Sequence, residues 1–70
     1  MERFGVASSN LKSVGYDPDE KILEVEFNSG AIYQYEGVPQ STYQDLLDAD
    51  SVGAYFNQNV KFAGYSYKRI

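Results

Sequence analysis

The last ten residues, KFAGYSYKRI, form the one stretch of this sequence in which basic and aromatic side chains interleave. Lysine and arginine bind phosphates, and tyrosine rings stack on unpaired bases, so the pattern is typical of a single-strand nucleic-acid contact. A segment of this kind is equally compatible with a sheet edge strand or with a docking segment for a protein partner. The candidate nucleic-acid contacts are Lys61, Tyr65, Tyr67, Lys68 and Arg69.

A second group of side chains with possible chemistry is the carboxylates Glu24, Glu26 and Glu36, with Gln34 between them. Paired carboxylates can hydrolyse glycosides or hold a metal ion. The chain contains no histidine and no cysteine, so it has neither the usual general base nor a thiolate ligand. Glutamates that alternate along a strand are typical of a solvated face. We therefore expect no enzymatic activity, no cofactor and no metal.

Charge is divided unevenly along the chain. Residues 1–50 hold ten acidic and three basic side chains, net −7, whereas residues 51–70 hold three basic and no acidic ones, net +3, which gives the total of −4. An acidic body repels phosphates and a basic end attracts them. Nucleic-acid binding is therefore expected only at residues 61–70.

The length of 70 residues predicts a single domain over 1–70, in which most large apolar side chains are needed for the core. No apolar run approaches the roughly 20 residues that span a bilayer, and the N-terminus lacks the apolar stretch of a signal peptide. With no cysteine to suggest an oxidising compartment, the expected location is the cytoplasm. The sequence does not determine the oligomeric state.

Two strands are predicted by alternating apolar and polar residues on either side of residues 28–30. A three-residue loop whose last residue is a left-handed glycine pairs Val25 with Tyr33 and Leu23 with Tyr35. A two-residue loop would split this apolar set across both faces. The three-residue loop is therefore favoured, and the two tyrosines are expected to fill the core rather than to stack on bases.

Another strand is predicted over residues 11–16. A four-residue turn over 17–20 would place Val14 opposite Leu23. A helix should begin at Pro39 and end near residues 49–50, because apolar side chains then recur at helical spacing. Ser51 is a candidate N-cap for a second short helix, in which Gly53 would allow close packing.

The predicted fold is an α+β domain: a three-stranded antiparallel meander with two short helices packed on one face and an extended C-terminal tail. Residues 61–70 show no helical period, and whether they form a strand is open. The predicted core consists of Val14, Tyr16, Leu23, Val25, Phe27, Tyr33, Tyr35, Leu46, Leu47 and Phe56.

Five segments in this order and spacing resemble the KTSC domain family: SSNLKSVGYD, LEVEFNSG, YQY, GVP and SVGAYFNQNV. That family comprises a short module at the C-terminus of some bacterial lysyl-tRNA synthetases and stand-alone small proteins, and we expect a stand-alone copy here. The resemblance implies no established activity, although the synthetase context suggests RNA. We expect a non-enzymatic binding module for RNA or other single-stranded nucleic acid, with protein–protein interaction through a sheet edge or the tail as the alternative.

Overall fold

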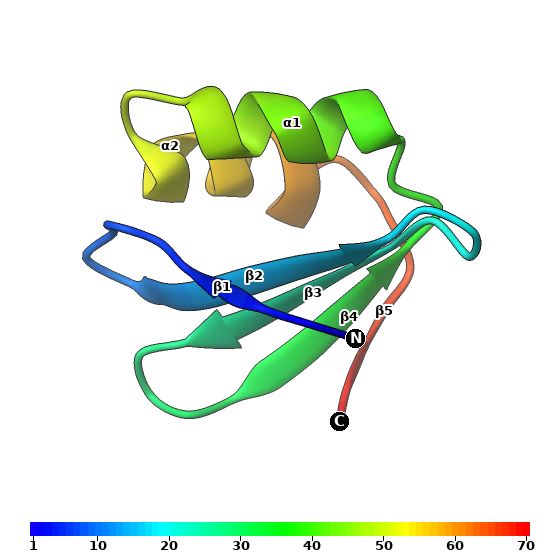
Figure 1. The fold of residues 1–70 in the computed structure, drawn as a ribbon, viewed down its shortest axis with the longest axis horizontal. Coiled ribbons are helices and arrows are strands. Elements are labelled where there is room, and N and C mark those ends of the chain that lie inside the picture. The colour runs from blue at the N-terminus through cyan, green and yellow to red at the C-terminus, as the bar shows by residue number, and fades with distance from the viewer.

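One antiparallel sheet of five strands forms the base of this computed structural model, which describes residues 1–70, and the helices lie on one of its faces (Figure 1). The strands lie side by side in chain order. They are β1 (Phe4–Gly5), β2 (Leu11–Asp17), β3 (Ile22–Phe27), β4 (Ile32–Glu36) and β5 (Tyr67–Arg69). The helical elements are α1 (Gln40–Asp48), α2 (Val52–Phe56) and the π-helical turn η1 (Asn57–Lys61).

The prediction of a three-stranded meander is wrong, because the central strands β2–β4 are flanked by a short strand on each side. β1 has two residues and β5 has three. Strands this short do not show the alternation over four or more residues by which strands are recognised in a sequence. The C-terminal segment is thus partly an edge strand, while the α+β class stands.

The predicted pairing of the β3–β4 hairpin is confirmed. Leu23 lies opposite Tyr35 and Val25 opposite Tyr33. Gly30 adopts a positive φ of 95°, as a three-residue loop of this type requires. These four apolar side chains therefore share the face of the sheet on which the helices pack.

The predicted register between β2 and β3 is wrong. Val14 lies opposite Val25 instead of Leu23, because the turn comprises residues 18–21 and Asp17 stays in the strand. The Asp17 carboxylate explains this position of the turn, since it accepts hydrogen bonds from the backbone N–H groups of Asp19 (3.0 Å) and Glu20 (3.2 Å). The predicted pairing is shifted by two positions along β3. Because side chains of a strand alternate between the two faces, a shift by two leaves every side chain on its predicted face.

The helices follow the predicted boundaries closely. α1 starts directly after Pro39 and ends at Asp48. The Ser51 hydroxyl accepts a hydrogen bond from the backbone N–H of Ala54 (3.3 Å) and so caps α2. A methyl group on Gly53 would lie 2.6 Å from Oδ1 of Asn10, which confirms close packing there. Neither helix combines the length and the apolarity that crossing a bilayer requires.

The core lies between the sheet and the helices, and Phe56 at its centre packs edge to face on Phe27 and Tyr35. Leu47 was expected there but is 39% exposed, because α1 turns only the side bearing Tyr43 and Leu46 towards the sheet. Tyr16, Phe27 and Tyr33 are half-buried at its edge. The buried apolar residues are Leu11, Val14, Leu23, Val25, Tyr35, Val38, Tyr43, Leu46, Val52, Phe56 and Val60.

Candidate functional site

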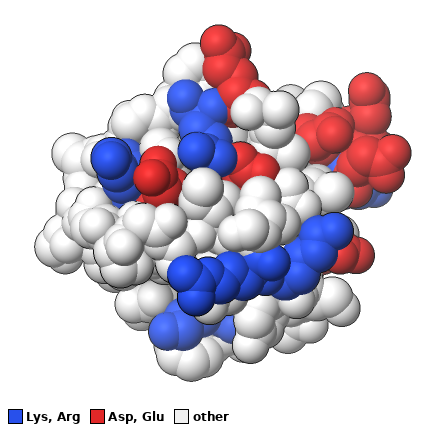
Figure 2. Space-filling model, turned by 90° about the horizontal axis from the view of Figure 1, so that it is seen from below, with Lys and Arg blue, Asp and Glu red and all other residues white.

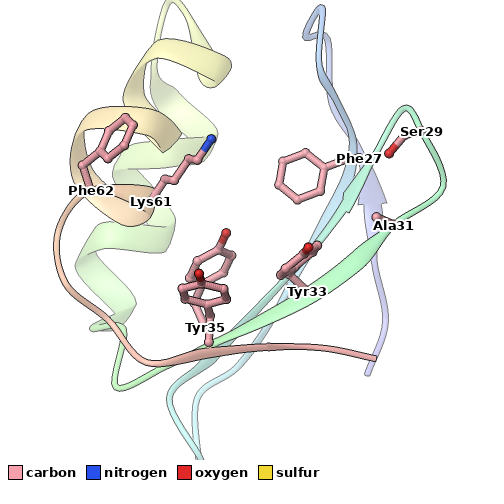
Figure 3. Close-up of a pocket in the computed structure, with 8 residues that line it drawn as sticks. Phe27, Ser29, Ala31, Tyr33, Tyr35, Lys61 and Phe62 are labelled. Atoms are coloured by element: carbon pink, nitrogen blue, oxygen red, sulfur yellow. The ribbon is translucent and has the colours of Figure 1, made fainter.

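The largest pocket lies between the helix-covered face of the sheet and the end of η1 (Figure 3). It has a volume of about 470 Å³. Six of its eight lining residues are hydrophobic, and none is acidic. The lining residues are Phe27, Ser29, Ala31, Tyr33, Tyr35, Lys61, Phe62 and Tyr67.

Strand pairing brings the aromatic floor of this pocket together. β5 places Tyr67 opposite Tyr35, so the two rings share a face, with centroids 5.5 Å apart. The Tyr33 ring lies 5.9 Å from Tyr67 and 5.7 Å from Phe27. Residues from three adjacent strands thereby form one continuous aromatic surface, to which Tyr67 comes from a distant part of the sequence.

Lys61 and Phe62 form the opposite wall. The backbone N–H of Phe62 donates to the carbonyl of Asn57 (3.1 Å), which closes the last turn of η1. The Phe62 ring is 75% exposed, and the Lys61 ammonium lies 5.5 Å from its centroid. Figure 3 shows this ammonium pointing into the space between the helical wall and Phe27. The pocket is thus aromatic with one positive charge directed into it.

The two tyrosines of β4 have different environments. Tyr35 is 4% exposed and its ring packs edge to face on Phe56. Burial, and to a lesser extent the neighbouring Tyr67 and Tyr33, raises the pKa of Tyr35 above its usual value, so its hydroxyl stays protonated at neutral pH. Tyr33 is half-buried and exposes part of its ring to the pocket. Tyr35 therefore acts as the floor, whereas Tyr33 is available to a ligand.

The five residues singled out in the C-terminal segment do not lie on one surface. Lys61 and Tyr67 line the pocket. Arg69 lies opposite Tyr33 on β4 and so projects from the same face. Lys68 lies opposite Gln34 and projects from the other face. Tyr65 is half-buried against the core.

Three pocket residues were not among the candidates predicted from the sequence. Phe62 directly follows Lys61 and belongs to the same basic and aromatic stretch, so the signal for it was present. Ser29 and Ala31 carry no such signal, since Ser29 is a small turn residue and Ala31 is a small residue directly before β4. Their position in the pocket depends on how the hairpin meets η1.

The opposite face of the sheet also differs from the prediction of a solvated row of glutamates. Glu24 is only 5% exposed. Its carboxylate accepts hydrogen bonds from the guanidinium of Arg3 and from Nε2 of Gln34 (2.8 Å). Arg3 also lies 3.9 Å from Glu26 and donates to the hydroxyl of Ser13 (3.2 Å). The N-terminal segment thus covers part of this face.

Gly15 allows that segment to approach, because any methyl group on Gly15 would collide with the carbonyl oxygen of Glu2. Figure 2 looks onto this side of the molecule and shows acidic and basic side chains intermixed in its upper half, with a row of Lys and Arg across its lower part. No group of three or more His, Cys, Asp or Glu side chains lies close enough together to hold a metal ion. Glu24 and Glu26 are thus engaged by neighbouring polar groups, whereas Glu36 is exposed.

Two proteins of known sequence are similar to this chain over most of its length. An uncharacterized protein from Stutzerimonas stutzeri is 56% identical over 70 residues, which cover 100% of this chain and 99% of that protein. A lysine–tRNA ligase from Nostoc punctiforme is 40% identical over 53 residues, which cover 76% of this chain but 9% of the ligase. The chain thus resembles a small part of that enzyme.

A solved structure and a family model agree with these relatives. The crystal structure of a KTSC domain protein from Yersinia pestis matches with a TM-score of 0.94 at 38% identity, over 99% of this chain and 96% of that one. The family model described as the KTSC domain matches residues 7–65, a range that includes every pocket residue except Tyr67. This chain therefore belongs to the KTSC domain family.

Proposed function

We propose that this KTSC domain binds single-stranded RNA through the aromatic pocket and the adjoining strand β5. The observation that carries the proposal is the Lys61 ammonium directed into a pocket of aromatic rings that contains no carboxylate. Arg69 adds a second cation on the same face. Proteins that bind single strands combine these two elements, rings for the bases and cations for the phosphates.

The charge distribution supports this location. The protein carries a net charge of −4, yet all three charged side chains after residue 50 are basic. The only ion pairs of the structure join Arg3 to Glu24 and Glu26, so Lys61, Lys68 and Arg69 are not neutralised by neighbouring carboxylates. The similarity to part of a lysine–tRNA ligase, a protein whose name includes an RNA substrate, favours RNA over DNA.

An enzymatic role has little support. The candidate carboxylates lie on the face away from the pocket, where Glu24 is engaged by Arg3 and Gln34. The pocket itself offers one lysine and hydroxyl groups, without a histidine or carboxylate to activate a nucleophile. The proposed activity is therefore binding without turnover.

A protein partner is the second candidate, because the 75% exposed Phe62 ring could insert into an apolar partner surface. Strand addition at β5 is less favoured. That edge is three residues long and carries Lys68 and Arg69, and short charged edges resist the pairing of further strands. The two candidates differ in salt dependence, because only phosphate contacts release counterions.

The test is binding of a fluorescently labelled single-stranded RNA at increasing salt, followed by anisotropy. The cations on the pocket face predict weak binding with a log–log salt slope between about −0.7, if one of them neutralises a phosphate, and about −1.4, if both do. The double variant Lys61→Glu, Arg69→Glu should lose binding. The control Lys12→Glu, Lys21→Glu changes net charge equally and should bind to within about twofold of the native protein.

Absence of binding by the native protein at low salt would overturn the proposal. Equal loss of binding in the site variant and in the control would show that net charge alone acts, and would also overturn it. A complex that forms with a protein and does not weaken with salt would favour the second candidate.

A further inference from the structure

We infer that the pocket receives one unstacked base and prefers uracil and guanine, which carry a carbonyl oxygen at position 4 or 6 of the ring, because Lys61 donates to that oxygen. This inference rests on the proposed function and specifies the ligand of the same site. It gives the two cations different roles, since Lys61 contacts the base and Arg69 contacts the phosphate.

The dimensions of the pocket suit a single base. Its volume of about 470 Å³ lies within the range of about 300 to 1,000 Å³ typical of small-molecule sites. The 62% exposed ring of Tyr67 and the partly exposed ring of Tyr33 are tilted by 45° to each other. A flat base can therefore stack on one of these rings while its edge points towards the helical wall.

The chemistry of the lining determines which edge is accepted. Lys61 is the only charged side chain in the pocket, and an ammonium group donates hydrogen bonds but accepts none. The other polar side chains, Ser29, Tyr33, Tyr35 and Tyr67, bear hydroxyls, which both donate and accept. An amino group could therefore donate only to these hydroxyls, because the pocket contains no carboxylate.

Because the Lys61 ammonium donates hydrogen bonds but accepts none, the pocket disfavours cytosine and adenine. Each of them presents an amino group where uracil and guanine present a carbonyl oxygen, so a donor would face the Lys61 ammonium. Uracil and guanine place an acceptor at the same point. The mostly aromatic lining is also a poor environment for a phosphate, which leaves the phosphate to Arg69 outside the pocket.

The experiment compares labelled hexauridylate with hexacytidylate, because the two bases share their ring size and differ only at positions 3 and 4, where cytosine has an acceptor nitrogen and an amino group in place of the N–H and carbonyl oxygen of uracil. Native protein should bind hexauridylate about tenfold more tightly, the effect expected of one hydrogen bond to a charged donor. Lys61→Met keeps the aliphatic stem and should reduce the ratio to about one. Arg69→Met should weaken both ligands by a similar factor and preserve the ratio.

Filling the pocket provides a second test. Ala31→Phe adds a ring to the lining and should abolish the preference for hexauridylate. The matched control Ile32→Phe adds a ring at the next residue, on the opposite face of the sheet, and should leave the preference intact. Amide chemical shifts of native protein provide a measurement independent of any variant: hexauridylate should move Ala31 and Phe62 more than hexacytidylate does.

Failure of this inference is distinguishable from failure of the proposed function. Salt-dependent RNA binding with equal affinity for the two ligands, unaffected by Ala31→Phe, would refute the base pocket and leave RNA binding in place. Unmoved Ala31 and Phe62 amides at saturating RNA would refute it in the same way. Absence of RNA binding would refute both.

Discussion

Replacing Arg3 by leucine should destabilise the protein, because it removes the cation that compensates a buried carboxylate. The Glu24 side chain is 6% exposed, and the Arg3 guanidinium donates to it while also binding the Ser13 hydroxyl. Strand β1 pairs with β2 at only two positions, so this ion pair is a main attachment of the N-terminal segment. The variant therefore loses a charge partner and loosens an edge strand.

The magnitude follows from the burial of the two partners. Removing one member of a fully buried ion pair costs about 3 to 5 kcal/mol. The Arg3 side chain is 29% exposed, and Gln34 keeps its hydrogen bond to Glu24, so we expect a smaller loss of about 1 to 2 kcal/mol. The total free energy of unfolding of a domain of this size is about 3.5 to 10 kcal/mol. The loss should therefore lower Tm by several degrees.

The loss should also depend on pH. Burial by itself would raise the pKa of Glu24, but hydrogen bonds from Gln34 and Arg3 and the charge of Arg3 outweigh burial and lower it below the usual 4.5. The native carboxylate therefore contributes stability above pH 4.5 that is lost as pH falls through its folded-state pKa. Without Arg3, burial is less well compensated and this pKa moves upward. The difference between native protein and variant should consequently shrink from pH 7 to pH 4.

Urea unfolding followed by circular dichroism at both pH values measures these differences. The double variant Arg3→Leu, Glu24→Gln is the control, because it removes the charge that the single variant leaves uncompensated. We expect it to be more stable than Arg3→Leu at pH 7. A single variant as stable as native protein at pH 7, or one whose deficit is the same at pH 4, would refute the assigned role of the ion pair.

Three further predictions concern packing inside the protein and are measured by the same unfolding experiment. Tyr35→Ala should cost about 2 to 5 kcal/mol because the ring is buried, and an unchanged Tm would contradict its place in the core. Gly15→Ala should lower the free energy of unfolding by about 1 to 3 kcal/mol because its methyl group would collide with the backbone carbonyl oxygen of Glu2, and a variant as stable as native protein would refute this contact. Leu46→Ala should lower the free energy of unfolding by about 2 to 5 kcal/mol because Leu46 is buried, whereas Leu47→Ala should lower it by less than about 1 kcal/mol because Leu47 is exposed. Equal losses would show that the two faces of α1 are wrongly assigned.

Local patterns in the sequence were sufficient to predict the central hairpin and both helices. The alternation around residues 28–30 allows one register that keeps Leu23, Val25, Tyr33 and Tyr35 on one face, and the structure has that register. Pro39 favours the start of α1 through its fixed backbone geometry, and Ser51 favours the start of α2 through one hydrogen bond to the backbone. Both effects are local, so the sequence around each residue is enough to predict the start of the helix. The turn before β3 was misplaced by one residue, because Asp17 both pairs in β2 and starts the turn.

The candidate site was only partly accessible to the same reasoning. Basic and aromatic residues at the C-terminal end indicated Lys61, Tyr67 and Arg69, and the structure places all three on one side of the sheet. Lys68 belongs to the same stretch but projects from the opposite face, because consecutive residues of a strand alternate. That separation depends on the chain forming a strand there, which the sequence left open.

The sequence by itself determined the class of the fold, the pairing of its central hairpin and the position of the positive charge. The tertiary structure alone decided that β1 and β5 extend the sheet, that Arg3 neutralises Glu24, and that η1 faces β4 across an aromatic pocket. These features join segments far apart in the chain, and β1 and β5 are too short for a local pattern to reveal them. They form because the larger sheet supplies unpaired backbone groups and a buried carboxylate that the chain ends then satisfy.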